Sequence, residues 1–123
     1  MPKILLVDDE ENIRLLYSEE LKDDGYDVAI ASDGKNLLKK IQDESPDLIV
    51  LDIKLADYNG LDLLQQIRRK YYNLPVILCS AYPSYKGGLK AMSADNYVIK
   101  SSDLNELKEK IKLALATFIP STK

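Results

Sequence analysis

The stretch Ile4-Leu5-Leu6-Val7-Asp8-Asp9 places two acidic residues directly after a run of apolar ones. The same arrangement recurs at Leu48-Ile49-Val50-Leu51-Asp52, at Val76-Ile77-Leu78-Cys79-Ser80 and at Tyr97-Val98-Ile99-Lys100. Short continuous apolar runs indicate strands that are buried on both faces, as in a parallel sheet. If these strands are parallel neighbours, the polar residues that follow them meet at one carboxyl edge of the sheet. Those residues are Asp8, Asp9, Asp52, Ser80 and Lys100.

Longer segments with helical periodicity separate the apolar runs. This alternation is typical of stacked βαβ units, and we count five strands and five helices. The remaining strand is predicted at Asp27 to Ala31. The helices are predicted at Glu11 to Asp23, around Leu37 to Ile41, around Leu61 to Ile67, near Ser84 to Met92 and along the stripe Leu104, Leu107, Ile111, Leu115 and Phe118. The sequence therefore predicts an α/β fold with helices on both faces of a five-stranded parallel sheet.

Local signals mark the ends of several helices. Gly25 ends the first helix, and the second ends before Ser45-Pro46, because a residue that precedes proline avoids the right-handed helical region. Asp103 and Glu106 have the spacing of a capping box at the start of the last helix. The fourth helix contains Gly87-Gly88, and a glycine inside a helix costs about 1 kcal/mol relative to alanine. We therefore expect the fourth helix to be the least stable element.

The composition fits a single globular domain over residues 1–123. Charged residues make up 30% and hydrophobic ones 46%, which excludes a disordered chain, and the apolar runs are too short to span a bilayer. The net charge of −3, without a dense cluster of lysine and arginine, argues against direct nucleic-acid binding. Because Cys79 is the single cysteine and no signal segment precedes Lys3, we expect a cytoplasmic protein in which Cys79 is buried and structural.

Three acidic residues are predicted to crowd the carboxyl edge. Asp8, Asp9 and Asp52 would destabilise the fold by mutual repulsion unless a cation compensates. Mg²⁺ fits because it takes hard oxygen ligands, whereas the lack of histidine disfavours zinc and copper. Acids after strands can also simply cap helices, but capping explains neither Ser80 nor Lys100. Carboxylates, a hydroxyl and an ammonium in one crevice instead point to phosphoryl chemistry.

Five motifs follow one another in a fixed order along the chain. They are Lys3-Ile4-Leu5-Leu6-Val7-Asp8-Asp9-Glu10, Pro46-Asp47-Leu48-Ile49-Val50-Leu51-Asp52-Ile53, Asn59-Gly60, Ser80-Ala81 and Ala94-Asp95-Asn96-Tyr97-Val98-Ile99-Lys100. With this order and spacing, the sequence resembles the receiver domain of bacterial two-component response regulators over essentially its whole length. The resemblance implies a flavodoxin-like, doubly wound parallel sheet with strand order 2-1-3-4-5. It also implies a phosphoprotein that catalyses only its own phosphorylation and dephosphorylation, and not an enzyme in the usual sense.

The resemblance assigns roles to individual residues. Asp52 is implied to be the phosphoacceptor, which takes a phosphoryl group from a histidine kinase or a histidine phosphotransfer protein. Lys100 and Ser80 are implied to contact phosphoryl oxygens, and Tyr97 to be an aromatic switch that turns inward when Ser80 moves. The implied ligands of Mg²⁺ are Asp9, Asp52, Asp8 through water, and the backbone carbonyl of Lys54.

The chain departs from the family pattern at three positions. Ser101 follows Lys100 where the family usually has a proline with a cis peptide, and a cis bond to serine would cost about 3–4 kcal/mol. Ser93 stands in place of a usual glycine and Ala56 in place of a usual proline. These changes bear on loop dynamics and on the direction of the Lys100 ammonium, but they remove no chemical group.

These observations lead to one main interpretation and two alternatives. The main one is a phosphorylation-controlled switch. Its output surface for an unidentified effector is formed by the fourth helix, the fifth strand and the fifth helix. The sequence leaves open whether the chain forms a homodimer through the last helix. The first alternative is a receiver-like adaptor that acts by phosphorylation-independent protein binding. The second is a hydrolase or nucleotide enzyme on the same sheet, but no Gly-rich phosphate loop follows the first strand.

Overall fold

The fold is described by a computed structural model that covers residues 2–32, 34–53, 59–80, 96–100 and 104–117. Within this part of the chain the strands are β1 (Lys3–Val7), β2 (Asp27–Ala31), β3 (Leu48–Asp52), β4 (Val76–Ser80) and β5 (Asn96–Ile99). The helices there are α1 (Glu11–Asp23), α2 (Leu37–Glu44), α3 (Gly60–Lys70) and α4 (Asn105–Thr117). The helix predicted near residues 84–92 lies outside the described residues, so α4 corresponds to the last helix of the sequence prediction.

The five strands form one parallel sheet in the order β2-β1-β3-β4-β5. Val7 of β1 lies opposite Leu51 of β3, and Ser80 of β4 lies opposite Ile99 of β5. The predicted flavodoxin-like, doubly wound sheet is therefore confirmed. Because β1, β3, β4 and β5 are consecutive neighbours, the residues that follow these strands lie along one continuous edge.

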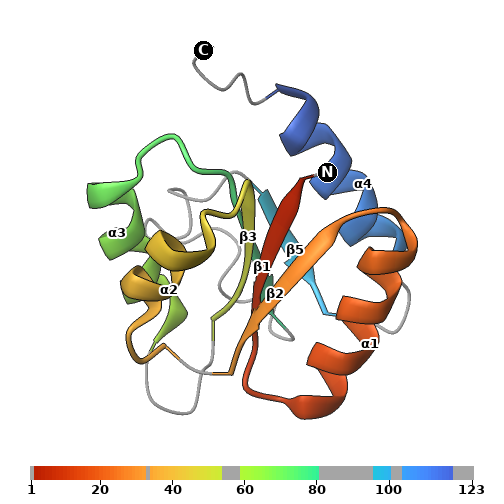
Figure 1. Cartoon of the computed structure of the whole chain (residues 1–123), viewed down its shortest axis with the longest axis horizontal. Coiled ribbons are helices and arrows are strands. Elements are labelled where there is room, and N and C mark those ends of the chain that lie inside the picture. The colour runs from red at the N-terminus through yellow and green to blue at the C-terminus, as the bar shows by residue number, and fades with distance from the viewer. Residues whose placement is uncertain (1, 33, 54–58, 81–95, 101–103, 118–123) are drawn as a thin grey trace.

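Helices cover both faces of the sheet, as Figure 1 shows, with α1 and α4 on one face and α2 and α3 on the other. Successive residues of a strand point to opposite faces, so a strand covered on both sides is apolar at every position. The core under α1 and α4 consists of Ile4, Leu6, Tyr17, Leu21, Leu48, Val50, Ile77, Cys79, Val98, Leu104, Leu107, Ile111 and Ala114. The core under α2 and α3 consists of Leu5, Val7, Leu37, Ile41, Ile49, Leu51, Ile53, Leu63, Leu64, Ile67, Val76 and Leu78.

The last helix, α4, packs through the apolar stripe that its sequence predicts. Leu115 is partly buried against the core, and the buried members of the stripe are Leu104, Leu107 and Ile111. Phe118 and the predicted capping residue Asp103 lie outside the described residues. Among the described helices, none combines the length and the apolar character needed to cross a bilayer.

The ends of α1 and α2 follow the local signals, with one difference. Gly25, just beyond α1, has a φ of 96°, a left-handed conformation that glycine adopts easily. α2 ends at Glu44, as the Ser45-Pro46 pair predicts. Ser45 adopts a left-handed conformation with a φ of 48°, and not the extended one that usually precedes proline. Its N–H donates to the Ile41 carbonyl oxygen at 2.8 Å, which closes the last helical turn.

The start of α3 lies against the end of β3. The side chain of Asn59 caps α3 by accepting a hydrogen bond from the Leu61 N–H at 2.8 Å. The N–H of Gly60 donates to the carbonyl oxygen of Ile53 at 2.6 Å. A Cβ atom on Gly60 would lie 2.1 Å from the carbonyl oxygen of Asp52 and 2.7 Å from the Cα atom of Ile53. Glycine is therefore required where α3 meets the backbone that carries Asp52.

We predict that Gly60→Ala lowers the free energy of unfolding by about 2 kcal/mol, because the added methyl group must displace the end of β3. The control is Gly25→Ala, whose methyl group would meet nothing within 4 Å. Its cost of roughly 1 kcal/mol comes from the left-handed backbone alone. Urea denaturation of both variants measures the difference, and a Gly60→Ala protein at least as stable as Gly25→Ala would contradict the close approach.

Candidate functional site

The residues predicted to form the site lie at the carboxyl ends of four neighbouring strands. Asp8 follows β1, Asp52 and Ser80 end β3 and β4, and Lys100 follows β5. The parallel register brings these ends level with one another. The backbone N–H of Lys100 donates to the carbonyl oxygen of Ser80 at 2.7 Å, which extends the pairing of β4 and β5 by one residue. The sheet thus gathers residues from distant stretches of the sequence.

Asp8, Asp9 and Asp52 form a cluster of carboxylates at this edge. One oxygen from each lies within 4.8 Å of the oxygens from the other two. Asp8 and Asp52 are only 2% and 4% exposed, whereas Asp9 is exposed. Negative charges this close repel one another, and burial removes much of the screening that water would provide. The cluster therefore requires a cation.

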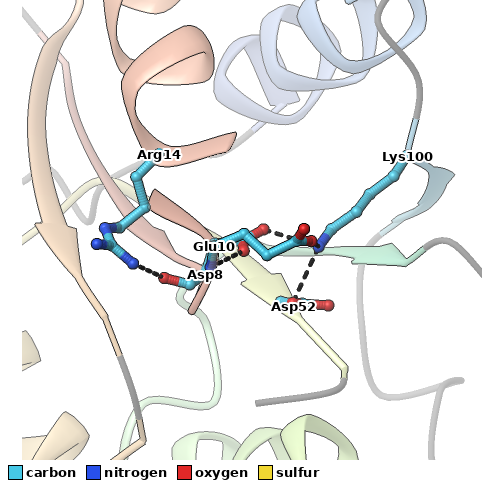
Figure 2. Close-up of polar contacts among 5 residues, drawn as sticks. All are labelled: Asp8, Glu10, Arg14, Asp52 and Lys100. Carbon is cyan, nitrogen blue, oxygen red and sulfur yellow. Dashed lines mark hydrogen bonds and ion pairs between the residues drawn. The ribbon is translucent and has the colours of Figure 1, made fainter. Parts of the chain in front are cut away.

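Lys100 supplies a positive charge to the cluster. Its Nζ atom lies 2.9 Å from Oδ2 of Asp8 and 3.0 Å from Oδ2 of Asp52, and Figure 2 shows the side chain reaching across from the end of β5. Burial lowers the pKa of the ammonium, but the hydrogen bonds and charges of the two carboxylates outweigh burial and raise the pKa well above its usual range. Lys100 is therefore charged throughout the neutral pH range.

Two residues to which the sequence analysis assigns no role, Glu10 and Arg14, hold the turn between β1 and α1. The N–H of Glu10 donates to Oδ1 of Asp8 at 2.9 Å, and the exposed Glu10 carboxylate lies 3.5 Å from Nζ of Lys100. Arg14 of α1 donates from Nη1 to the backbone carbonyl oxygen of Asp8 at 2.8 Å (Figure 2). An arginine near a helix N-terminus opposes the macrodipole, and this unfavourable placement is the signal that could have identified Arg14.

Ser80 and Tyr97, the predicted switch residues, lie on β4 and β5. Ser80 is 1% exposed. Tyr97 is partly buried, pairs in register with Leu78 and packs against the core under α2 and α3. Their roles in switching stay predictions. Several residues of the sequence analysis lie outside the described part of the chain, namely Lys54, Ala56, Ser93 and Ser101.

The carboxylate cluster has the donor atoms that magnesium prefers. Its ligand oxygens are hard, come from Asp8, Asp9 and Asp52, and lie close enough together to contact one ion. The sequence has no histidine, and its only thiol, that of Cys79, is buried, so a zinc or copper ligand set is not available. A bound Mg²⁺ would share Asp8 and Asp52 with the Lys100 ammonium.

The predicted burial of Cys79 is confirmed. Cys79 is 2% exposed on β4, and burial is the main cause that raises the pKa of its thiol to about 12. The thiolate is the reactive form of cysteine, so this thiol is unreactive at neutral pH.

We predict that Cys79 makes the fold sensitive to alkali. The folded chain holds the thiol proton up to about pH 12, whereas the ordinary thiol pKa is 9.0, so the unfolded state loses this proton first as the pH rises. The free energy of unfolding should therefore fall more steeply above pH 9 in the natural protein than in Cys79→Ala. Urea denaturation at a series of pH values measures the two slopes, and equal slopes would count against this explanation.

An open α/β sheet binds its ligands beyond the carboxyl ends of its strands, and here that region is an acidic pocket with a facing lysine. This fold and pocket define a signalling module of the receiver type. The response regulator receiver domain family matches residues 4–112, and the chain belongs to this family. As predicted, it is a receiver domain and not a conventional enzyme.

Two curated relatives are transcriptional or response regulators. The chain is 39% identical over 116 residues to the alkaline phosphatase synthesis transcriptional regulatory protein PhoP of Bacillus subtilis. It is 38% identical over 117 residues to the response regulator ArlR of Staphylococcus saprophyticus. The alignments cover 92% and 94% of this chain but 48% and 53% of PhoP and ArlR, so the chain spans about half the length of these relatives.

Solved structures share the fold. The response regulator TrrA of Thermotoga maritima, crystallised in complex with Mg(2+)-BeF, is 43% identical and superposes with a TM-score of 0.89, over 93% of this chain and 99% of TrrA. A crystal structure of the histidine kinase ThkA in complex with TrrA matches with a TM-score of 0.87 and 43% identity, over 94% of this chain and 99% of the matched chain.

We predict that Lys100→Met destabilises the protein by about 3 kcal/mol in the absence of divalent cations, because it leaves the buried carboxylates of Asp8 and Asp52 without their counter-charge. Mg²⁺ should then raise the melting temperature of Lys100→Met by more than that of the natural protein, since the metal no longer competes with the ammonium. Calorimetry with EDTA and with MgCl₂ measures both effects.

The matched control is Lys108→Met. Lys108 pairs with Glu20 and Asp24 at 2.9 and 3.7 Å, but these contacts lie away from the carboxylate cluster and are more exposed. Their loss should cost little stability, because exposed ion pairs contribute little, and should leave the response to Mg²⁺ unchanged. If Mg²⁺ stabilises Lys100→Met and Lys108→Met equally, the ammonium and the metal do not share carboxylates.

Proposed function

We propose that the chain is a phosphorylation-controlled switch that accepts a phosphoryl group on Asp52. The observation that carries the proposal is the pairing of Asp52 with Lys100, whose Oδ2 and Nζ atoms lie 3.0 Å apart beside the buried carboxylate of Asp8. An acceptor carboxylate needs cations close by, because phosphoryl transfer brings negative charges together. Membership of the receiver family supports the same assignment.

In the proposed reaction, an oxygen of Asp52 attacks the phosphorus atom of a phosphohistidine. The P–O bond forms as the P–N bond breaks, and the imidazole leaves with the electron pair of that bond. The Lys100 ammonium lies beside the Asp52 carboxylate before transfer and would then pair with an oxygen of the transferred group. Asp9, Asp52, the backbone carbonyl of Lys54 and, through water, Asp8 would hold Mg²⁺, which would supply further positive charge to the phosphoryl oxygens.

Ser80 and Tyr97 are proposed to convert phosphorylation into a conformational change. The Ser80 hydroxyl would donate to another phosphoryl oxygen, and its movement would let Tyr97 turn inward. Ser80 is linked to the end of β5, because its carbonyl oxygen accepts the Lys100 N–H at 2.7 Å. A new anion on Asp52 would therefore bias a two-state surface that includes the predicted fourth helix, β5 and α4.

The proposed phosphodonor is a histidine kinase or a histidine phosphotransfer protein. The support is the similarity to TrrA, which is 43% identical and was crystallised with the histidine kinase ThkA. The downstream effector is not identified, and homodimerisation through α4 on phosphorylation is a further proposal. We also propose that residues 1–123 form one receiver domain, of which the family matches 4–112, and we expect it in the cytoplasm.

The test is the mass of the intact protein after incubation with acetyl phosphate and MgCl₂. We expect a phosphoryl adduct that forms on the natural protein, is lost with EDTA and is absent from Asp52→Asn. Asp43→Asn is the matched control, because it removes an exposed carboxylate from α2 and should leave the adduct in place. The adduct should survive denaturation in acid and disappear with hydroxylamine, since an acyl phosphate reacts with that nucleophile.

Failure to form any adduct with acetyl phosphate and with a panel of histidine kinases would overturn the proposal. The phosphorylation-independent adaptor would then be the better interpretation of the same fold. An adduct that persists in Asp52→Asn would instead move the acceptor to another residue.

A further inference from the structure

We propose that Arg14 is a positioning residue that fixes the direction of the Asp9 carboxylate for Mg²⁺. The inference rests on the proposed function, because it concerns the same metal site. Figure 2 draws no contact between Arg14 and the carboxylates of Asp8 and Asp52. Its guanidinium instead donates from Nη1 to the backbone carbonyl oxygen of Asp8 at 2.8 Å.

The position of Arg14 on α1 explains how it reaches this carbonyl. Side chains on a helix point toward its N-terminus, so a long side chain in the first turns extends back over the residues that precede the helix. The Arg14 N–H makes the first hydrogen bond of α1, to the Glu10 carbonyl oxygen at 3.0 Å. Backbone and side chain of Arg14 thus hold the two ends of the turn that carries Asp9.

The carbonyl that Arg14 binds belongs to the peptide that joins Asp8 to Asp9. A peptide unit is planar, so fixing its oxygen fixes the plane that contains the Cα atom of Asp9. Asp8 is also held by its own N–H, which donates to the Ala31 carbonyl oxygen at 3.1 Å, and by Oδ1, which accepts the Glu10 N–H at 2.9 Å. Asp9 itself is exposed at the edge of the cluster, so the direction of its carboxylate depends on this backbone.

A positioning role and a purely electrostatic role predict opposite effects on metal affinity. Arg14 carries a positive charge and contacts the backbone of Asp8, a member of the carboxylate cluster, so by charge alone its removal should strengthen the binding of a divalent cation. If Arg14 acts by holding the Asp8–Asp9 peptide, its removal should weaken binding, since Asp9 would then have to be ordered by the metal.

The test is a titration of the isotope-labelled protein with MgCl₂ alone, followed through backbone amide NMR shifts at Asp8, Asp9 and Glu10. Arg14→Gln has a shorter, neutral side chain, and we expect it to weaken Mg²⁺ binding on the order of tenfold. Arg14→Lys keeps the charge and a donor, so it should bind within about twofold of the natural protein. In the metal-free protein, the Asp9 amide should shift in Arg14→Gln, because its own peptide loses the hydrogen bond.

The matched control is Lys22→Gln, which removes one positive charge from the exposed last turn of the same helix. It should leave Mg²⁺ affinity and the Asp9 amide unchanged. The proposal is overturned if Arg14→Gln binds Mg²⁺ as tightly as the natural protein or more tightly, or if its metal-free Asp9 amide does not shift. The melting temperature of each variant is measured first, so that Mg²⁺ affinities and amide shifts are compared only at temperatures at which all the proteins are folded.

The same variants separate this inference from the proposed function. If Arg14→Gln weakens Mg²⁺ binding and shifts the Asp9 amide while the natural protein takes up no phosphoryl group, the positioning role stands and the phosphorylation proposal fails. If the natural protein is phosphorylated on Asp52 and Arg14→Gln binds Mg²⁺ with undiminished affinity, the phosphorylation proposal stands and the positioning role fails.

Discussion

The Lys100 ammonium between Asp8 and Asp52 is the interaction on which the site depends. Parallel strands deliver these carboxylates to one edge with very little exposure, and without a counter-charge their repulsion would oppose the sheet register that brings them together. A buried ion pair of this kind is poor evidence for added stability, since apolar residues would often do as well. In the proposed function, its value is that it places a positive charge beside the carboxylate that would accept the phosphoryl group.

Much of the fold could be predicted because a parallel sheet leaves a simple pattern. Strands buried on both faces are apolar at every position, so β1, β3 and β4 are visible as continuous runs, and the residue after each run marks the carboxyl edge. The edge strand β2 is only partly buried, and it contributes no residue to the cluster of Asp8, Asp9, Asp52 and Lys100. The chemically important residues were therefore also the ones with the clearest local signal.

The contacts that sequence reasoning missed join a side chain to a backbone or bring two backbones together. Arg14 binds the Asp8 carbonyl, and its placement near the N-terminus of α1 is only an indirect signal of that contact. Gly60 leaves room for the carbonyl of Asp52, and no sequence pattern predicts that close approach. In the sequence, only the resemblance to the family identifies the Asn59-Gly60 motif, whereas the structure supplies its physical reason. Ser45 was expected to leave the helix, but whether it would become extended or left-handed depended on a hydrogen bond to Ile41.

Because two cations would share the same carboxylates, metal binding and phosphorylation could be coupled to a conformational change. In the proposed function the ammonium and a metal would both bind Asp8 and Asp52, so the arrival of metal and phosphoryl group would change the partners of Lys100. Lys100 directly follows β5, the strand that carries Tyr97, and its N–H is bonded to the Ser80 carbonyl. In the proposed switch, a change in the partners of the Lys100 side chain would therefore shift the backbone that pairs β4 with β5. A site in which Lys100 contacted neither Asp8 nor Asp52 would lack this link, because the metal could then enter without changing the partners of the ammonium.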